Sequence, residues 1–168
     1  MSDPPFRFCP RCATPLAPRE IAGDDAARPR LACPALGCGF VYWDNPVPVV
    51  AAIVERPDGV VLVRSKGWPE TWFGLVTGFL ERGESPEEGV LREVAEELGL
   101  VATLGDFVGV YPFHQANQII MAWHVRAEGE VRLGDELAAF KSIPVERLRP
   151  WPFATGDAVR DWLARRRG

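Results

Sequence analysis

One stretch of the chain is crowded with acidic side chains: seven glutamates and two arginines lie among the twenty-three residues from Gly78 to Leu100. Glu93, Glu96 and Glu97 follow one another at spacings of three and one, which places them on one face of a helix, where like charges repel. A solvated acidic face is the common alternative, but apolar residues at neighbouring positions predict that these acids border the core. Carboxylates close to the backbone carbonyls around Thr77 would form a hard oxygen site suited to Mg²⁺.

The segment SPEEGVLREVAEELG predicts the helix that positions these acids. Ser85 is expected as the N-cap, Pro86 as the first helical residue and Glu88 as the partner in a capping box. Gly99 is expected to end the helix. The helix should bury an apolar stripe made of Val90, Leu91, Val94 and Leu98.

The surrounding sequence predicts strands, with one further helix at the end. VVAAIVERPDGVVLVR reads as two strands that flank the turn Pro57-Asp58-Gly59. Asp44–Val49, with its two prolines, reads as an extended linker that precedes them. Mixed strands and helices predict an α/β fold. The remaining elements are expected at LVTGF, Phe107–Tyr111, Ile119–Arg126, AAFKSI and, as a helix, GDAVRDWLARRR.

The four cysteines form two pairs in the first part of the chain. Cys9 and Cys12 have the spacing C-x2-C, and Cys33 and Cys38 follow after twenty residues with the spacing C-x4-C. Two such pairs can present four thiolates to one tetrahedral Zn²⁺. Residues 1–43 lack a long apolar pattern, so this segment needs the metal to hold it together. Four incidental thiols are the alternative.

The overall composition bounds the function. With 168 residues and 47% hydrophobic residues, the chain suits a globular domain with a small appendage. The net charge of −4 argues against broad attraction to nucleic acid or an anionic membrane. No run reaches the length of a transmembrane helix, and the N-terminus lacks the apolar core of a signal peptide. A cytoplasmic location is the default expectation.

The pattern G-x5-E-x7-R-E-U-x-E-E-x-G-U, where U is aliphatic, identifies the chain as resembling the Nudix hydrolases. All nine positions match: Gly78, Glu84, Arg92, Glu93, Val94, Glu96, Glu97, Gly99 and Leu100. The segment that begins FCPRCATPL resembles the zinc ribbon that precedes a subset of this family. The resemblance implies an α/β/α sandwich with a mixed sheet over residues 44–168, preceded by a small zinc ribbon over residues 1–43.

The resemblance also implies roles for the motif residues. Glu93, Glu96 and Glu97, with the carbonyl of Thr77, would bind Mg²⁺ or Mn²⁺. Gly78 would allow the backbone to approach the metal, and Arg92 would orient Glu93 and pair with Glu84. The catalytic base would be Glu93 or an acid on a later loop, where RLGDELAAF offers Asp135 and Glu136.

The resemblance implies that the substrate carries a nucleoside diphosphate linked to another group, as in FAD, NADH or ADP-ribose. NADH pyrophosphatases carry a Ser-Gln-Pro-Trp-Pro-Phe-Pro signature after the box, whereas this chain has GVYPFHQANQII there. Pro150-Trp151-Pro152-Phe153 is interpreted as a structural corner. His114 is a weaker candidate for contact with a substrate phosphate, and a homodimer is compatible with the family. Candidates for stacking on a base are Trp43, Phe79, Tyr111, Phe113 and Trp123.

A function of a different class is a non-catalytic module that senses nucleotides or binds nucleic acid through the ribbon. The complete set of box glutamates argues against sensing alone, because a site that only binds needs no base. The net charge of −4 argues against nucleic acid, although RLRP and ARRRG supply local basic residues.

Overall fold

The computed structural model describes residues 6–24 and 28–167. The chain forms two compact units, Met1–Asn45 and Pro46–Gly168. The predicted zinc ribbon, residues 1–43, includes residues 1–5 and 25–27, which lie outside the described part. Among the described residues, no helix is both long and apolar enough to span a membrane.

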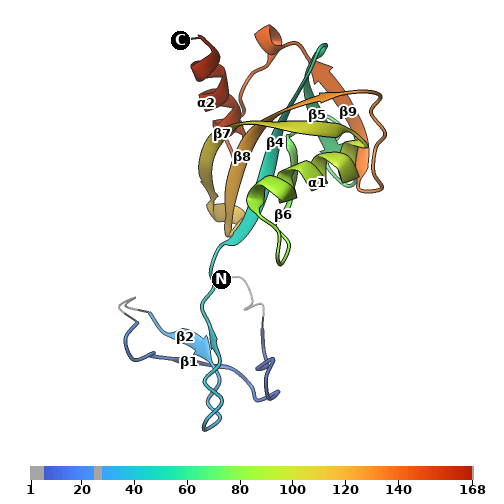
Figure 1. Cartoon of the computed structure of the whole chain (residues 1–168). Helices are drawn as coiled ribbons and strands as arrows, with labels where there is room; N and C mark the ends of the chain where they lie inside the picture. The colour runs from blue at the N-terminus through green and yellow to red at the C-terminus, as the bar shows by residue number, and fades with distance from the viewer. Residues whose placement is uncertain (1–5, 25–27, 168) are drawn as a thin grey trace. The chain divides into compact units, whose positions relative to one another are not determined.

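The first unit contains a small antiparallel sheet in the order β1-β2-β3 (Figure 1). Its strands are β1 (Ala17–Arg19), β2 (Arg30–Ala32) and β3 (Val41–Tyr42). Strands of two or three residues show no alternation of apolar and polar residues, so the sequence gives no signal for them. Cys9, Ala32 and Cys33 are the buried apolar residues of this unit among those described.

A six-stranded mixed sheet forms the centre of the second unit, and it matches the predicted α/β fold with a mixed sheet. Its strands run in the order β7-β8-β4-β5-β9, and β6 pairs with β4 alone. β4 and β8 are parallel, whereas the other paired strands are antiparallel. The strands are β4 (Val47–Arg56), β5 (Gly59–Ser65), β6 (Val76–Phe79), β7 (Val101–Phe113), β8 (Gln118–Glu128) and β9 (Leu137–Ile143).

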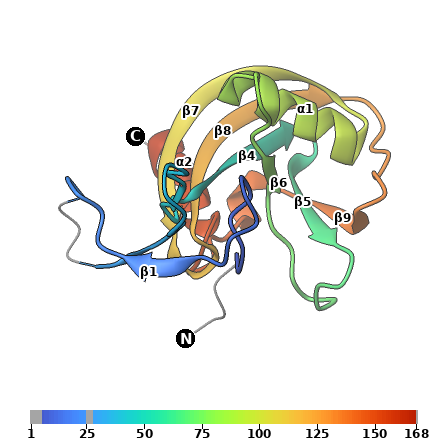
Figure 2. The same ribbon diagram turned by 90° about the horizontal axis from the view of Figure 1, so that it is seen from below.

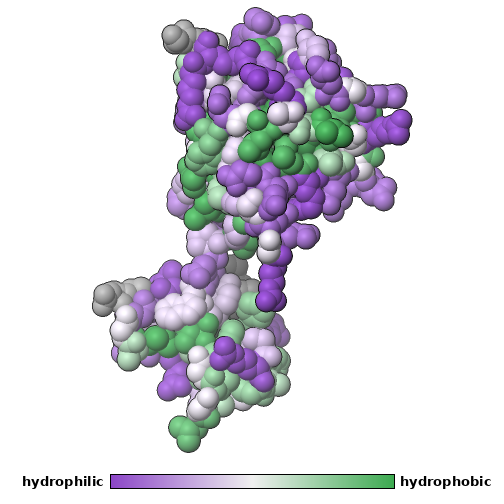
Figure 3. Space-filling model, viewed as in Figure 1, coloured by the Kyte–Doolittle hydropathy of each residue, from purple (hydrophilic) through white to green (hydrophobic). Residues whose placement is uncertain are grey.

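The two helices, α1 (Pro86–Leu98) and α2 (Gly156–Arg167), cover opposite faces of this sheet (Figures 1 and 2). The centre of β4 is apolar without alternation because residues 49–54 are all buried. Its odd-numbered side chains, such as Ala51, pack in the core beneath α2, and its even-numbered side chains, such as Val50, pack beneath α1. These two clusters are the two inner layers of the predicted sandwich, whereas hydrophilic and hydrophobic residues are interspersed on the surface seen in Figure 3.

The predicted hairpin, the short strand at residues 75–79 and both helices are confirmed. Two boundaries are wrong. β7 begins at Val101 rather than near Phe107, since an irregular register around residues 104–109 admits Gly105 and Asp106 into the strand. The predicted proline linker already contributes Val47–Val49 to β4, where Pro48 lies opposite Ile119.

Candidate active site

The acids of α1 are presented by a helix whose ends are both fixed by local contacts. The Ser85 side chain accepts from the backbone N–H of Glu88, and the Glu88 carboxylate accepts from the N–H of Ser85. Gly99 adopts a left-handed conformation with φ of 64°, which ends the helix. Val90, Val94 and Leu98 are fully buried, while Leu91 is only partly buried. The helix can therefore rotate little, and its acidic face borders the core.

Arg92 holds the acidic cluster together, because each of its five N–H donors has an acceptor. It binds both oxygens of Glu84, with Nε–Oε2 and Nη2–Oε1 distances of 3.0 and 2.8 Å. Nη1 donates to Glu93 Oε1 at 2.8 Å and to Glu96 Oε2 at 3.0 Å, and Nη2 donates to the carbonyl of Phe79 at 3.1 Å. The guanidinium lowers the pKa of Glu84 to about 2. Arg92 thus fixes the orientation of Glu93.

Gly78 explains how Glu93 reaches the sheet. A methyl group at Gly78 would overlap the carboxyl group of Glu93, so glycine is required for this close approach. The side chain of Glu93 is mostly buried, and that burial raises its pKa. One carboxylate oxygen is bound by Arg92, which leaves the other available to a ligand.

Glu97 has the properties of a metal ligand. Its Oε2 atom is buried and has no hydrogen-bond partner within the described part of the chain. Burial, together with the nearby charges of Glu93, Glu136 and Glu96, raises its pKa to about 8. Glu96, by contrast, is 60% exposed. A buried carboxylate oxygen with no donor, beside other carboxylates, fits a divalent cation.

The loop at residues 129–136 carries the second acidic candidate, and it is bound to the end of α1. Arg132 and Gly134 donate their backbone N–H groups to the carbonyls of Leu98 and Glu97 at 2.8 and 2.9 Å. A methyl group on Gly134 would lie 2.5 Å from the carbonyl oxygen of Glu96, so the close contact depends on glycine here too. Asp135 and Glu136 are exposed and line the same pocket of about 430 Å³ as the box acids.

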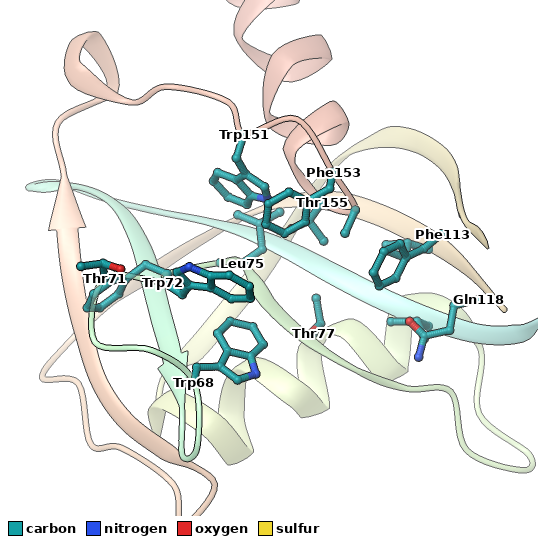
Figure 4. A pocket seen from close by; sticks show the side chains of 15 residues that line it. Trp68, Thr71, Trp72, Leu75, Thr77, Phe113, Gln118, Trp151, Phe153 and Thr155 are labelled. Carbon is teal, nitrogen blue, oxygen red and sulfur yellow. The ribbon is translucent and has the colours of Figure 1, made fainter. Parts of the chain in front are cut away.

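A second cavity, of about 470 Å³, is shown in Figure 4. Thr77 lines both hollows. Thr77 lies opposite Ala51 of the α2-side core, whereas Gly78 lies opposite Val50 of the α1-side core. Thr77 and Gly78, which follow each other in β6, therefore lie toward opposite faces of the sheet, and the two hollows meet at this point of the strand. Six aromatic residues line this cavity: Phe73 and the five that Figure 4 labels, Trp68, Trp72, Phe113, Trp151 and Phe153.

Only one of the five predicted stacking residues, Phe113, lines this cavity. Tyr111 is buried and donates its hydroxyl to Asp161 at 3.0 Å, and Trp123 is buried against Phe107. Phe79 lines the acidic pocket instead. His114 is exposed and lines neither hollow. Trp43 belongs to the first unit.

The segment Pro150–Phe153 is more than the corner that the sequence suggested, since Trp151 and Phe153 form part of the cavity wall. Trp68 and Trp72 were not identified from the sequence at all. The available signal was the WPETW stretch, in which two tryptophans flank a short loop. These two tryptophans form a cavity wall only together with segments some eighty residues away, and no local pattern reveals that arrangement.

The four cysteines come together in the first unit. Their Sγ atoms all lie within 4.8 Å of one another. The Sγ atoms of Cys12 and Cys33 are 3.5 Å apart, and those of Cys9 and Cys38 are 3.6 Å apart. Tetrahedral Zn²⁺ with Zn–S bonds of about 2.3 Å requires sulfur atoms about 3.8 Å apart. All four thiols are free, so the cluster fits a structural zinc ion.

Comparison with known proteins agrees with the fold described for the second unit. The model of the NUDIX domain matches residues 45–163. The crystal structure of a NUDIX hydrolase from Nitrosomonas europaea superimposes with a TM-score of 0.81 at 23% identity, covering 96% of this chain and 93% of that one. At this identity the likeness concerns the fold.

Two kinds of relative are similar in sequence. The NAD-capped RNA hydrolase NudC of Pseudomonas aeruginosa is 29% identical over 167 residues, which cover 96% of this chain. This chain spans only 57% of that protein's length. The ADP-ribose pyrophosphatase of Methanocaldococcus jannaschii is 28% identical over 131 residues, covering 74% of this chain and 77% of that protein.

Proposed function

Because the chain belongs to the NUDIX domain family, we propose that it hydrolyses the diphosphate bond of a nucleoside diphosphate linked to another group, with Mg²⁺ or Mn²⁺ as cofactor. FAD, NADH and ADP-ribose represent the substrate class. The observation that carries the proposal is the buried, unpartnered Oε2 of Glu97, in an acidic pocket that shares Thr77 with an aromatic cavity. This pairing suits a ligand with a polyanionic bridge and a flat ring.

Each box residue has a defined task in this proposal. Glu93, Glu96, Glu97 and the carbonyl of Thr77 would hold the metal. Arg92, fixed by Glu84, would keep the Glu93 carboxylate in one orientation. When bound, the metal would neutralise the diphosphate and lower the pKa of the attacking water.

The proton of the attacking water needs an acceptor within the pocket. Glu136 is exposed there, on a loop that is bound to the end of α1, and Glu93 is the alternative base. Arg92 already binds one oxygen of Glu93, which fixes the orientation of this carboxylate and suits it to hold a metal ion. This contact favours Glu136 as the base and leaves Glu93 as a metal ligand.

The relatives support the substrate class, since their names specify NAD-capped RNA and ADP-ribose. Both substrates contain an ADP group joined through a diphosphate. None of the fifteen residues that line the cavity carries a formal charge, so these residues offer no cation for the tail of a nucleoside triphosphate. We therefore expect diphosphate-linked compounds to be better substrates than triphosphates.

The test is kcat/KM for FAD, NADH, NAD⁺, ADP-ribose and the common nucleoside triphosphates under one Mg²⁺ concentration. Hydrolysis of at least one diphosphate-linked compound, lost on chelation of Mg²⁺, is the expected result. Binding without turnover would favour the non-catalytic nucleotide sensor, and a preference for triphosphates would contradict the substrate class. A structural Zn²⁺ at the cysteine cluster and a homodimer complete the proposal, and sedimentation velocity tests the latter.

A further inference from the structure

The aromatic cavity is rich in π-faces and free of formal charge. Six aromatic rings line it, and none of the fifteen lining residues in the described chain carries a formal charge (Figure 4). Three of the six tryptophans of the chain belong to this wall. Polar lining side chains are limited to Thr71, Thr77, Gln118 and Thr155. Such a wall interacts with a ligand mainly through ring faces.

The rings come from three separate segments and remain open to a ligand. Trp68 and Trp72 lie on the loop before β6, and they are 42% and 55% exposed. Trp72 and Phe153 approach with centroids 6.2 Å apart and planes tilted by 47°. The Trp68 ring lies on Gly74, where a methyl group would touch it at 3.5 Å. The faces are therefore only partly used by contacts within the protein.

An aromatic face carries negative potential, so it attracts a cation, and the indole ring of tryptophan does so most strongly. One ring of the wall already makes a cation–π contact within the protein. Lys141 places its Nζ atom 3.9 Å from the centroid of Phe73, which lines the cavity. Lys141 does not itself line the cavity, and none of the lining residues carries a positive charge, so five of the six rings have no lysine or arginine contact among those described. The acidic pocket beyond Thr77 adds negative charge when no metal is bound.

We propose that this cavity selects a flat ring with a delocalised positive charge, namely an N-substituted pyridinium or an N-alkylated purine, over the neutral ring of the same shape. A neutral ring can stack on the same walls, but it lacks the cation–π attraction. The proposal rests on the proposed function only for the diphosphate that connects this ring to the acidic pocket. The ring preference itself depends on the cavity alone.

The test uses ligands without phosphate, which need no metal. Nicotinamide riboside has a cationic ring, and its reduced dihydro form has nearly the same atoms and a neutral ring. Binding of each to the Mg²⁺-free chain of 168 residues is measured by isothermal titration calorimetry. We expect the cationic form to bind at least about fivefold more tightly. 7-Methylguanosine against guanosine tests the purine as the source of the charge.

Two variants link the preference to the cavity. Trp68→Leu and Trp72→Leu keep apolar volume but remove a ring face, and both positions are exposed enough for the fold to persist. Each should reduce the preference for the cationic riboside by at least about twofold. Trp43→Leu is the matched control, because Trp43 is 44% exposed and belongs to the other unit.

Three results would overturn the proposal: equal or tighter binding of both neutral ligands, a preference unchanged in both cavity variants, or the same loss in the control. A preference for 7-methylguanosine alone would assign the site to alkylated purines, and one for the pyridinium alone to nicotinamide-type rings. These measurements contain no hydrolysis step. Failure of the proposed function would appear as absent turnover, and failure of this inference as absent discrimination.

Discussion

Gly78 and Glu93 lie so close that a methyl group on the glycine would overlap the carboxyl group of the glutamate. The Gly78→Ala variant must therefore displace Glu93 from the position in which Arg92 holds it. A misplacement of about 1 Å can cost a factor of about 100 in rate. We expect kcat/KM on the best diphosphate substrate to fall by about that factor while the thermal unfolding midpoint changes little. Steady-state kinetics and a thermal scan measure both, and unchanged kinetics would contradict the assignment of this pair to the site.

Glu97→Gln should stabilise the metal-free protein while nearly abolishing Mg²⁺-dependent hydrolysis. In the unfolded chain Glu97 ionises near 4.5, whereas in the folded protein its pKa is raised to about 8. Between these values the folded state keeps a proton that the unfolded state has lost. The free energy of unfolding of the wild type therefore falls as pH rises through this window, and glutamine removes that loss.

The difference in unfolding midpoint between Glu97→Gln and the wild type, both with chelator, should thus be larger at pH 8 than at pH 5. A gain of only about 1 kcal/mol corresponds to about 2–4 °C. Adding Mg²⁺ should stabilise the wild type and not the variant. Glu87→Gln is the control, because Glu87 is exposed and lies outside the acidic pocket. A difference independent of pH would contradict the argument.

Arg92→Lys should lower kcat/KM by about 10–100-fold, in the range found when partners of metal ligands are changed. Lysine keeps the charge but cannot reproduce the five contacts that the planar guanidinium makes with Glu84, Glu93, Glu96 and the Phe79 carbonyl. Arg82→Lys is the matched control, because Arg82 is exposed and does not line the pocket. An equal loss in both variants would contradict the role assigned to the contacts of Arg92.

The cysteine cluster should bind one zinc ion per chain, measured by elemental analysis of protein prepared without chelator. Cys33→Ser should lose the metal, since Cys33 is one of the four thiols gathered in the cluster. Proteolysis should then cut the first unit before the second, because the first unit buries little apolar surface and the second has a double core. Protein that never contains zinc, or a disulfide within the cluster, would contradict the site.

The sequence predicted what local patterns encode. The Ser85–Glu88 capping box and the Gly99 terminus are short-range signals, and both appear as expected. The contact of Arg92 with Glu84 follows from the motif in the same way. The early start of β7 was missed because Gly105 and Asp106 resemble a turn, and they belong to the strand only because the residues on either side of them pair with β8.

The cavity was missed for a different reason. Its wall combines Trp68 and Trp72 with Phe113 and with Trp151 and Phe153, residues that lie more than eighty positions apart in the extreme case. Each aromatic residue alone is more often part of a core, so composition cannot separate a wall residue from a core residue. Tyr111 and Trp123 illustrate the opposite error, since both are buried in the cores.

The position of Thr77 and Gly78 on β6 has a consequence for the length of acceptable substrates. Thr77 lies toward the α2 side of the sheet and Gly78 toward the α1 side, and β6 pairs with β4 alone among the described strands. A molecule with its ring in one hollow and its bridge in the other must cross a single strand. The width of this one backbone therefore sets the number of bonds between the ring and the bridge. Compounds with a longer or shorter connection cannot occupy both hollows at once.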